Sequence, residues 1–332
     1  MPPSSAKRLC HNGEVKYLFF DCECANCYDH QGKICSFGYT ITDTQFKVLD
    51  KKDLIMNPNA PFDPHVLGIG ENSIDLAYTP LRFQYAPKFD FFFPVLVDLL
   101  TDKDTVVFGY AIENDIGFLY SECLRYQKTM PEFSFFDIQE IYRIYREWDR
   151  SPSLEDALKD LQVPFDGYSE HQSSDDAEMS MLLLKQIVKE TGESVEALEQ
   201  TYPTSAGNTP IFMIQAKLAS LPQRDLGLPY DAESREDNRT FNQLIHYVDP
   251  EVTNRDFANR RFLFSRLARQ DSGTAVELAN AIIDRSGQTV RYLKEATDYV
   301  VYDNEEKKQV QELLSPLPLR LLSIEELKTL FK

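Results

Sequence analysis

The chain has 332 residues and a formal net charge of −18, and 42% of its residues are hydrophobic. This length allows two domains, and the apolar fraction is sufficient for packed cores. A chain so acidic cannot hold a nucleic acid through a broad basic field, so action on a polyanion requires bridging cations or a short local contact. Residues 1–190 carry 18 Lys and Arg against 31 Asp and Glu, whereas residues 257–332 carry 12 against 11.

Targeting signals and cysteine spacing indicate the cellular compartment in which the protein is expected. No run of about 18 apolar residues occurs, so no membrane span is predicted, and the opening MPPSSAKRLCHNGE lacks the apolar core of a signal peptide. The six cysteines do not have the spacing of a secreted disulfide framework. A zinc site is the alternative, but no paired C-x-x-C and no following pair of histidines occur. We therefore expect a cytoplasmic protein with reduced thiols at positions 10, 22, 24, 27, 35 and 123.

The first part of the chain alternates strand-like and helix-like segments. Strand patterns occur at 16–22, 34–42, 45–50, 104–110 and 133–137. Helical spacing of apolar residues occurs at 88–100, 114–127, 138–148, 153–163 and 175–192. Pro94 favours a helix start at that residue, Ser153 is a suitable N-cap, and Gly192 a suitable C-terminal stop. This order predicts an α/β fold with a mixed sheet flanked by helices.

Turn-forming residues then interrupt the pattern. TYPTSAGNTP (201–210) is typical of a linker, and 211–256 reads as polar and partly helical. From 257 onward the order is strand, helix, strand, strand, helix, strand, helix, which suits a small α/β domain. We therefore predict a first domain at 1–195, a linker with a partly helical segment at 196–256, and a second domain at 257–332.

Two carboxylates end the first strand. In KYLFFDCECAN an apolar run is followed by Asp21 and Glu23. Alternate side chains of a strand share a face, so these two point the same way. Like charges on one face repel unless each is solvated or a cation lies between them. Both a solvated strand end and a divalent metal site fit this stretch.

Further acids stand at strand-to-helix junctions. Asp115 follows the strand at 104–110, and Asp175 and Asp176 begin the helix a few residues after His171. An acid at a helix N-terminus complements the helix dipole, which is a sufficient explanation for each acid taken singly. Mg²⁺, however, prefers several oxygen ligands. The ordered set D-x-E, N-D-x-x-x-L and H-x-x-x-x-D-A favours a metal site.

Together these motifs resemble the DEDDh branch of the 3′–5′ exonuclease superfamily, over about residues 15 to 190. Motif one is Asp21-Cys22-Glu23, motif two is GYAIENDIGFL with Asp115, and motif three runs from His171, its spacing selecting Asp176 rather than Asp175. The resemblance implies a ribonuclease H-like fold with a five-stranded mixed sheet. Relatives of this kind include proofreading subunits of bacterial polymerases and RNA-trimming enzymes.

The resemblance also implies a chemistry. Two divalent cations, Mg²⁺ or Mn²⁺, would be held by Asp21, Glu23, Asp115 and Asp176 and would grip a scissile phosphate. His171, with an unperturbed pKa of about 6.5, would take the proton of the attacking water. Nucleoside 5′-monophosphates would be released from 3′ ends of single-stranded nucleic acid, with DNA favoured and RNA possible. Asp175 is expected only to complement the helix dipole.

Two departures from the family pattern bear on substrate. Tyr110 and Ala111 stand where many members have His-Asn. Cys24 and Ala25 stand where two threonines often line the 3′-terminal nucleotide, so these two are the predicted substrate-binding positions. An exoribonuclease of short RNA and a non-catalytic adaptor that retains the fold are the alternative functions.

Residues 257–332 resemble a BRCT domain by hydrophobic pattern, with Leu330-Phe331 where a Trp is common. The resemblance implies binding of a protein partner, a phosphopeptide or a DNA end. A phosphate pocket would use Ser265 after the first strand and Lys307 or Lys308 at a later helix; a plain docking module is the alternative. The densest basic cluster of the chain consists of Arg260, Arg261, Arg266 and Arg269. It could contact nucleic acid, or it could be a solvent-exposed rim with no ligand.

Overall fold

The computed structural model describes residues 14–28, 31–71, 73–74, 76–148, 150–169, 171–221, 232–295 and 297–331. The chain divides into two units, Met1–Pro210 and Ile211–Lys332. The division falls inside the segment predicted as a linker. Cys10 lies outside the described residues, and the five described cysteines are free thiols. In the described ranges, no helix is long and apolar enough to cross a membrane.

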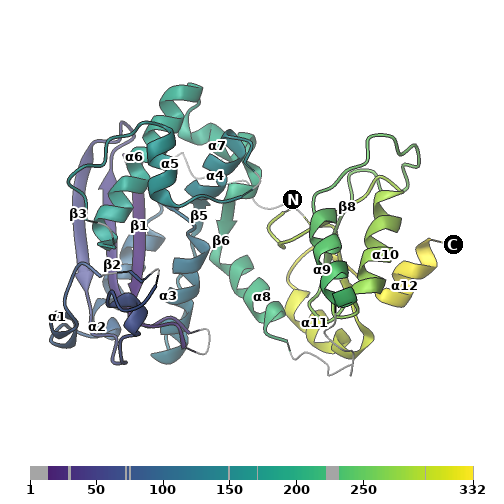
Figure 1. The fold of residues 1–332 in the computed structure, drawn as a ribbon, viewed down its shortest axis with the longest axis horizontal. Helices are drawn as coiled ribbons and strands as arrows, with labels where there is room; N and C mark the ends of the chain where they lie inside the picture. The colour runs from purple at the N-terminus through teal and green to yellow at the C-terminus, as the bar shows by residue number, and fades with distance from the viewer. Residues whose placement is uncertain are drawn as a thin grey trace. The chain divides into compact units, whose positions relative to one another are not determined.

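A six-stranded mixed sheet in the order β3-β2-β1-β4-β5-β6 forms the centre of the first unit (Figure 1). β1 is antiparallel to β2 and parallel to β4. The predicted α/β fold with a mixed sheet is confirmed, with one strand more than expected, because β6 pairs with β5 from within the predicted linker. The strands are β1 Lys16–Cys24, β2 Ile34–Thr42, β3 Val48–Ile55, β4 Thr105–Gly109, β5 Ser134–Asp137 and β6 Ala206–Asn208.

The helices of this part follow most of the predicted boundaries. Ser153 caps α5 through Asp156 N–H, and Gly192 ends α6 with φ 71°, both as predicted. The start predicted at Pro94 is wrong: α2 begins at Phe89, whose buried ring packs against Phe93, and the proline lies inside the helix. The helices are α1 Pro80–Gln84, α2 Phe89–Thr101, α3 Glu113–Arg125, α4 Ile138–Tyr145, α5 Leu154–Asp160, α6 Ser173–Thr191 and α7 Leu198–Thr201.

One face of the sheet carries the core that positions the carboxylates. Tyr17 and Phe19 of β1 are buried in a core shared with α4, α5 and α6. Because side chains alternate along a strand, Asp21 and Glu23 lie on this same face, farther along β1. α6 packs on β1, β2 and β3, whereas α3, which also packs on β1 and β2, adds no residue to this core. β1 therefore ends with both acids on the side that α6 covers.

The second unit contains a four-stranded parallel sheet in the order β10-β9-β7-β8. Phe262 and Phe264 of β7 face a core with α10 and α12, and Leu263 faces another with α8 and α11. The predicted order of elements from residue 257 is confirmed. The elements of this unit are α8 Thr209–Ala219, α9 Ala232–Leu244, β7 Arg261–Phe264, α10 Ser272–Ile283, β8 Gln288–Val290, β9 Tyr299–Tyr302, α11 Lys307–Leu314, β10 Arg320–Ser323 and α12 Ile324–Leu330.

Candidate active site

Three carboxylates meet where β1 ends and α6 begins. One oxygen atom from each of Asp21, Glu23 and Asp176 lies within 4.8 Å of the other two. All three side chains are partly exposed, and that of Glu23 retains 14% of its surface. A single cation can contact oxygens gathered this closely, since Mg²⁺ and Mn²⁺ sites are built from such ligands.

Gly38 of β2 lets α6 approach the sheet this closely. It stands opposite Asp21 in the β1–β2 ladder. A Cβ atom on Gly38 would lie 2.0 Å from the carbonyl carbon of Ser173 and 2.0 Å from the nitrogen of Ser174. Any larger residue would push the first turn of the helix away, so the glycine sets the distance between Asp176 and the acids of β1.

Partial burial and nearby acids raise the pKa of each member of this group. The pKa of Asp21 lies well above its usual value, because the group is buried and because Asp115 and Asp176 are close. Burial also raises the pKa of Glu23, against the opposing effect of its hydrogen bond with His171. Burial, followed by the charge of Glu23, raises the pKa of Asp176 to about 7. A bound cation would reverse these shifts by stabilising the ionised forms.

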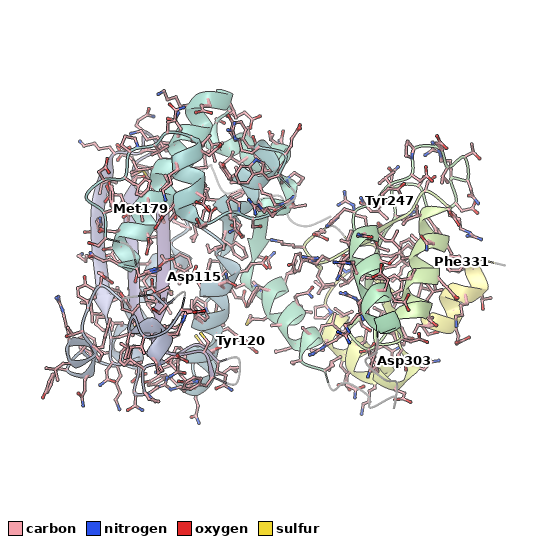
Figure 2. All side chains as sticks on the ribbon, viewed as in Figure 1. Asp115, Tyr120, Met179, Tyr247, Asp303 and Phe331 are labelled. Atoms are coloured by element: carbon pink, nitrogen blue, oxygen red, sulfur yellow. The ribbon has the colours of Figure 1, made fainter. Side chains whose placement is uncertain are left out.

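Asp115 borders the three-carboxylate group without belonging to it. It lies in the first turn of α3, is 4% exposed, and is labelled in Figure 2. Its Oδ1 accepts the N–H of Cys22 at 3.0 Å, which fixes the carboxylate against the backbone of β1. Asp137, which motif reading missed, accepts the N–H of Ala111 at 3.0 Å and so holds the turn that leads into α3.

His171 lies beside the same group. Its Nδ1 is 3.6 Å from Glu23 Oε1, and its side chain is 36% exposed. The residue adopts a left-handed backbone conformation with φ 59°, in the loop just before α6. The structure therefore brings His171, Glu23 and Asp176 together at one edge of the sheet, with the imidazole open to solvent.

Asp175 does more than complement the helix dipole, so that expectation is wrong. Its Oδ1 accepts a hydrogen bond from Lys51 Nζ at 2.5 Å, and its Oδ2 accepts the N–H of Ser169 at 2.8 Å. Lys51 also bonds to Glu178 at 2.6 Å. These contacts tie β3, α6 and the loop carrying His171 together. The sequence offers no signal for them, because Lys51 and Asp175 are 124 positions apart.

Cys24 and Ala25 are buried, at 7% and 0% exposure. Ala25 packs in a small core with Cys35, Leu76 and Phe83. The structure therefore does not support contact between these two side chains and a nucleotide. A group of three or more metal-ligating residues that includes a cysteine does not occur in the described ranges.

The predicted phosphate pocket of the second unit is also unsupported. Ser265 is 1% exposed and its hydroxyl donates to the carboxylate of Glu306. A phosphate at this hydroxyl would meet that carboxylate. Lys307 opens α11, and Lys308 on the same helix pairs with Glu312 at 4.0 Å.

Residues 18–184 match the sequence model of the family described as Exonuclease. The chain belongs to this exonuclease family. The matched range runs from β1 to α6 and contains every carboxylate of the site. The mixed sheet with flanking helices agrees with the ribonuclease H-like fold predicted from the motifs. No curated protein sequence matches the chain.

Solved structures of nucleases share part of this arrangement. A 3′-exonuclease that recognises the 3′ end of a histone mRNA stem-loop is 16% identical with a TM-score of 0.46, over 53% of this chain and 64% of that one. Exonuclease X in complex with 5′-overhanging duplex DNA is 16% identical with a TM-score of 0.42, over 53% and 95%. E. coli exonuclease I in complex with a dA16 oligonucleotide is 16% identical with a TM-score of 0.41, over 53% and 41%.

Proposed function

We propose that the first unit is a metal-dependent 3′–5′ exonuclease of the DEDDh branch. It releases nucleoside 5′-monophosphates from single-stranded or frayed 3′ ends. The observation that supports this most is the convergence of Asp21, Glu23 and Asp176 within 4.8 Å, in a chain of the exonuclease family. His171, whose Nδ1 is 3.6 Å from Glu23, supplies the titratable base that hydrolysis requires.

The donor set fits divalent cations. It consists of hard carboxylate oxygens, and in the described part of the chain no lysine or arginine forms an ion pair with Asp21, Glu23 or Asp176. These three acids and Asp115 would hold two Mg²⁺ or Mn²⁺ ions, which when bound supply positive charge to the scissile phosphate and acidify a water.

The residues of the chain have separate tasks in this proposal. His171 accepts the proton of the attacking water, and Glu23 stabilises the resulting imidazolium, since its oxygen is 3.6 Å away. Asp115 is held in one orientation by the N–H of Cys22, so it is ready for a ligand without reordering. Asp176 projects from α6, whose first turn rests on the backbone at Gly38.

Single-stranded DNA is the favoured substrate class, and RNA is the second candidate. No described contact identifies a residue that would read a 2′-hydroxyl, so the polymer has to be determined by kinetics. The second unit is proposed to be a BRCT-like domain that binds a protein partner or a nucleic acid end. Its all-parallel sheet in the order β10-β9-β7-β8, with helices on both faces, supports this assignment.

The test is digestion of 5′-labelled single-stranded DNA and RNA of equal sequence with Mg²⁺ or Mn²⁺. We expect a ladder that shortens from the 3′ end and disappears in chelator. Asp176→Ala should lower the rate by about 1,000-fold or more, as for loss of a central catalytic group. Asp166→Ala, which removes an exposed acid between α5 and α6, is the matched control and should cut normally.

Folded wild-type protein that shortens neither polymer with either metal would overturn the proposal. The non-catalytic adaptor would then be the better description. Calorimetric titration with Mn²⁺ gives a second readout, because the adaptor has no need to bind the metal and Asp176→Ala should weaken binding if the carboxylates hold it.

A further inference from the structure

Three arginines gather at one end of the second sheet. β7 and β8 are parallel neighbours with Leu263 opposite Val290. Arg291 directly follows β8, and Arg266 and Arg269 lie in the turn that follows β7. Because parallel strands end at the same edge of a sheet, all three stand at one edge. Asp303, labelled in Figure 2, follows β9 and marks this same edge.

Arg266, Arg269 and Arg291 are called the strand-end arginines below, and the described contacts of the first two are to neutral groups. Arg266 donates to the carbonyl oxygen of Ala219 at 3.0 Å. Arg269 lies over the ring of Phe241, 4.7 Å from its centroid, and donates to Asn242 Oδ1 at 3.1 Å.

No carboxylate pairs with any of the three guanidiniums within the described second unit. The acids nearest in sequence bond to other groups: Asp271 accepts the N–H and the hydroxyl of Thr274 at 3.1 and 2.8 Å, and Glu295 Oε2 accepts the backbone N–H groups of Arg291 and Tyr292 at 2.7 and 3.1 Å. Burial, and after it the charge of Arg291, lowers the pKa of Arg269.

The other two arginines of the predicted basic cluster, Arg260 and Arg261, lie at the opposite end of β7 and have other contacts. Arg260 pairs with Asp298 at 3.2 Å, and Arg261 donates to the carbonyl oxygen of Glu295. Both stand at the start of β7, the opposite end of the strand from Arg266. The sequence cluster is therefore two groups at opposite ends of β7, and an acid pairs with Arg260 of the first group.

Uncompensated like charges in a chain with a net charge of −18 are unexpected, since acids to pair with them are abundant. Such a group is stabilised by an external anion. Guanidinium matches phosphate oxygens in geometry and binds them through paired N–H groups. Three arginines spread over two strand ends suit a row of phosphates better than a single one, which favours a nucleic acid strand over a phosphopeptide.

We propose that the strand-end arginines bind the backbone phosphates of a nucleic acid strand. This inference rests on the proposed function, because it takes the substrate polymer to be a nucleic acid. The contact would supply the local positive charge that the acidic first unit lacks. Because both sites lie on one chain, binding of one part of a strand raises the effective concentration of the rest at the other site.

The test measures binding by the full chain to a long, labelled single-stranded oligonucleotide by fluorescence anisotropy. Chelator is present, so the carboxylate group repels phosphate and contributes nothing. We expect Arg266→Gln with Arg291→Gln to weaken binding and to lower the slope of log K against log salt by about 0.7 for each lost phosphate contact. Arg260→Gln, which removes an exposed arginine paired with Asp298, is the matched control and should bind as wild type.

Binding of the double variant equal to wild type, with an unchanged salt slope, would overturn the proposal. Tighter binding of a phosphoserine peptide than of the oligonucleotide at the same salt would overturn it in favour of a peptide site. Hydrolysis of a dinucleotide with Mn²⁺ distinguishes failure of this proposal from failure of the proposed nuclease function. The double variant should hydrolyse the dinucleotide at the wild-type rate, whereas a chain without nuclease activity hydrolyses it in neither form.

Discussion

The two sheets of the molecule end their strands in opposite charges. β1 ends in Asp21 and Glu23, which are joined by Asp176 within 4.8 Å. β7 and β8 end near Arg266 and Arg291, which have no acidic partner among the described residues. In both places like charges crowd without compensation, which costs folding free energy and is relieved by a ligand of opposite sign. Net charge therefore says little about where a polyanion would be held, since on the two proposals one cluster takes cations and the other an anion.

The two clusters also differ in how they are held. The acids are fixed by backbone contacts, at Gly38 for α6 and at the N–H of Cys22 for Asp115. The arginines lie beside turns, with Arg266 and Arg291 exposed. Function at the acidic cluster should therefore depend on geometry, and function at the basic cluster on salt. Substitutions that affect one cluster alone would test this difference.

Among substitutions that leave every carboxylate in place, the largest effect should come from Gly38→Ala. The added Cβ would lie 2.0 Å from the backbone of Ser173 and Ser174, whereas contacts below 3.0 Å essentially never occur. The start of α6 must retreat by at least the difference, which moves Asp176 away from Asp21. Displacement of a catalytic group on this scale lowers turnover by about 100-fold. Nuclease rate is the measurement, and oligonucleotide binding in chelator should be unchanged.

Gly207→Ala is the matched control for this substitution. It crowds the same sheet, because its Cβ would lie 2.4 Å from the ring of Phe135, but at β6 rather than at the carboxylates. It should lower thermal stability and leave the nuclease rate of the folded protein close to wild type. Equal loss of rate in both variants would show that general destabilisation, and not the position of α6, explains the result.

The sequence could predict those parts of the site that depend on residues close together in the chain. Alternation along one strand placed Asp21 and Glu23 on a common face, and spacing within one loop placed His171 just before Asp176. Long-range contacts could not be predicted in this way. Nothing near Gly38 in the chain indicates that a helix start more than 130 residues later will rest on it.

The same limit explains the wrong or unsupported expectations. Asp175 appeared to be a simple helix acid because its partner Lys51 is remote in sequence. Cys24 and Ala25 were expected at the nucleotide because of their place in a motif, but their burial depends on how the following loop packs. The basic cluster was counted as one group because its arginines are close in sequence, whereas β7 places Arg260 and Arg266 at opposite ends of the strand.

A smaller effect is expected from Asp175, a positioning residue. Asp175→Ala removes the acceptor for the N–H of Ser169 and leaves Lys51 with one of its two acidic partners. The loop carrying His171 then loses its attachment to α6, so we expect a fall in kcat of about 10-fold, with a smaller change in KM. The measurement is steady-state kinetics on the preferred polymer.

Asp175→Asn separates positioning from charge. An asparagine oxygen can still accept from Ser169, but the side chain no longer pairs ionically with Lys51. If the loop attachment matters, this variant should recover most of the kcat lost in Asp175→Ala. If both variants are equally slow, the ion pair with Lys51 is the important contact, and the positioning argument through Ser169 is wrong.

The smallest effect on activity is expected at a buried acid of the first unit that has a cation beside it, where the change is in stability. Glu122 of α3 is 1% exposed and bonds to Arg125 at 2.8 Å. Burial, opposed by Arg125, raises its pKa to about 7 from 4.5. Folding therefore favours the protonated form, and the resulting stability is complete below the unfolded pKa and is lost as pH rises through about 7. Glu122→Gln should remove this loss, which is on the order of 2 kcal/mol between pH 5 and 8.

Thermal unfolding in chelator across this pH range measures the effect. The Tm of Glu122→Gln should rise relative to wild type with increasing pH, and parallel curves would contradict the argument. Glu190→Gln is the control, because hydrogen bonds from Tyr145 and Gln186 lower the pKa of this exposed acid. A lowered pKa gives stability that is present above the unfolded pKa and lost only as pH falls through the folded one, so its curve should parallel wild type. A cation from the chain itself thus leaves Glu122 with a moderate pH dependence, whereas in the described part of the chain no lysine or arginine pairs with Asp21, Glu23 or Asp176.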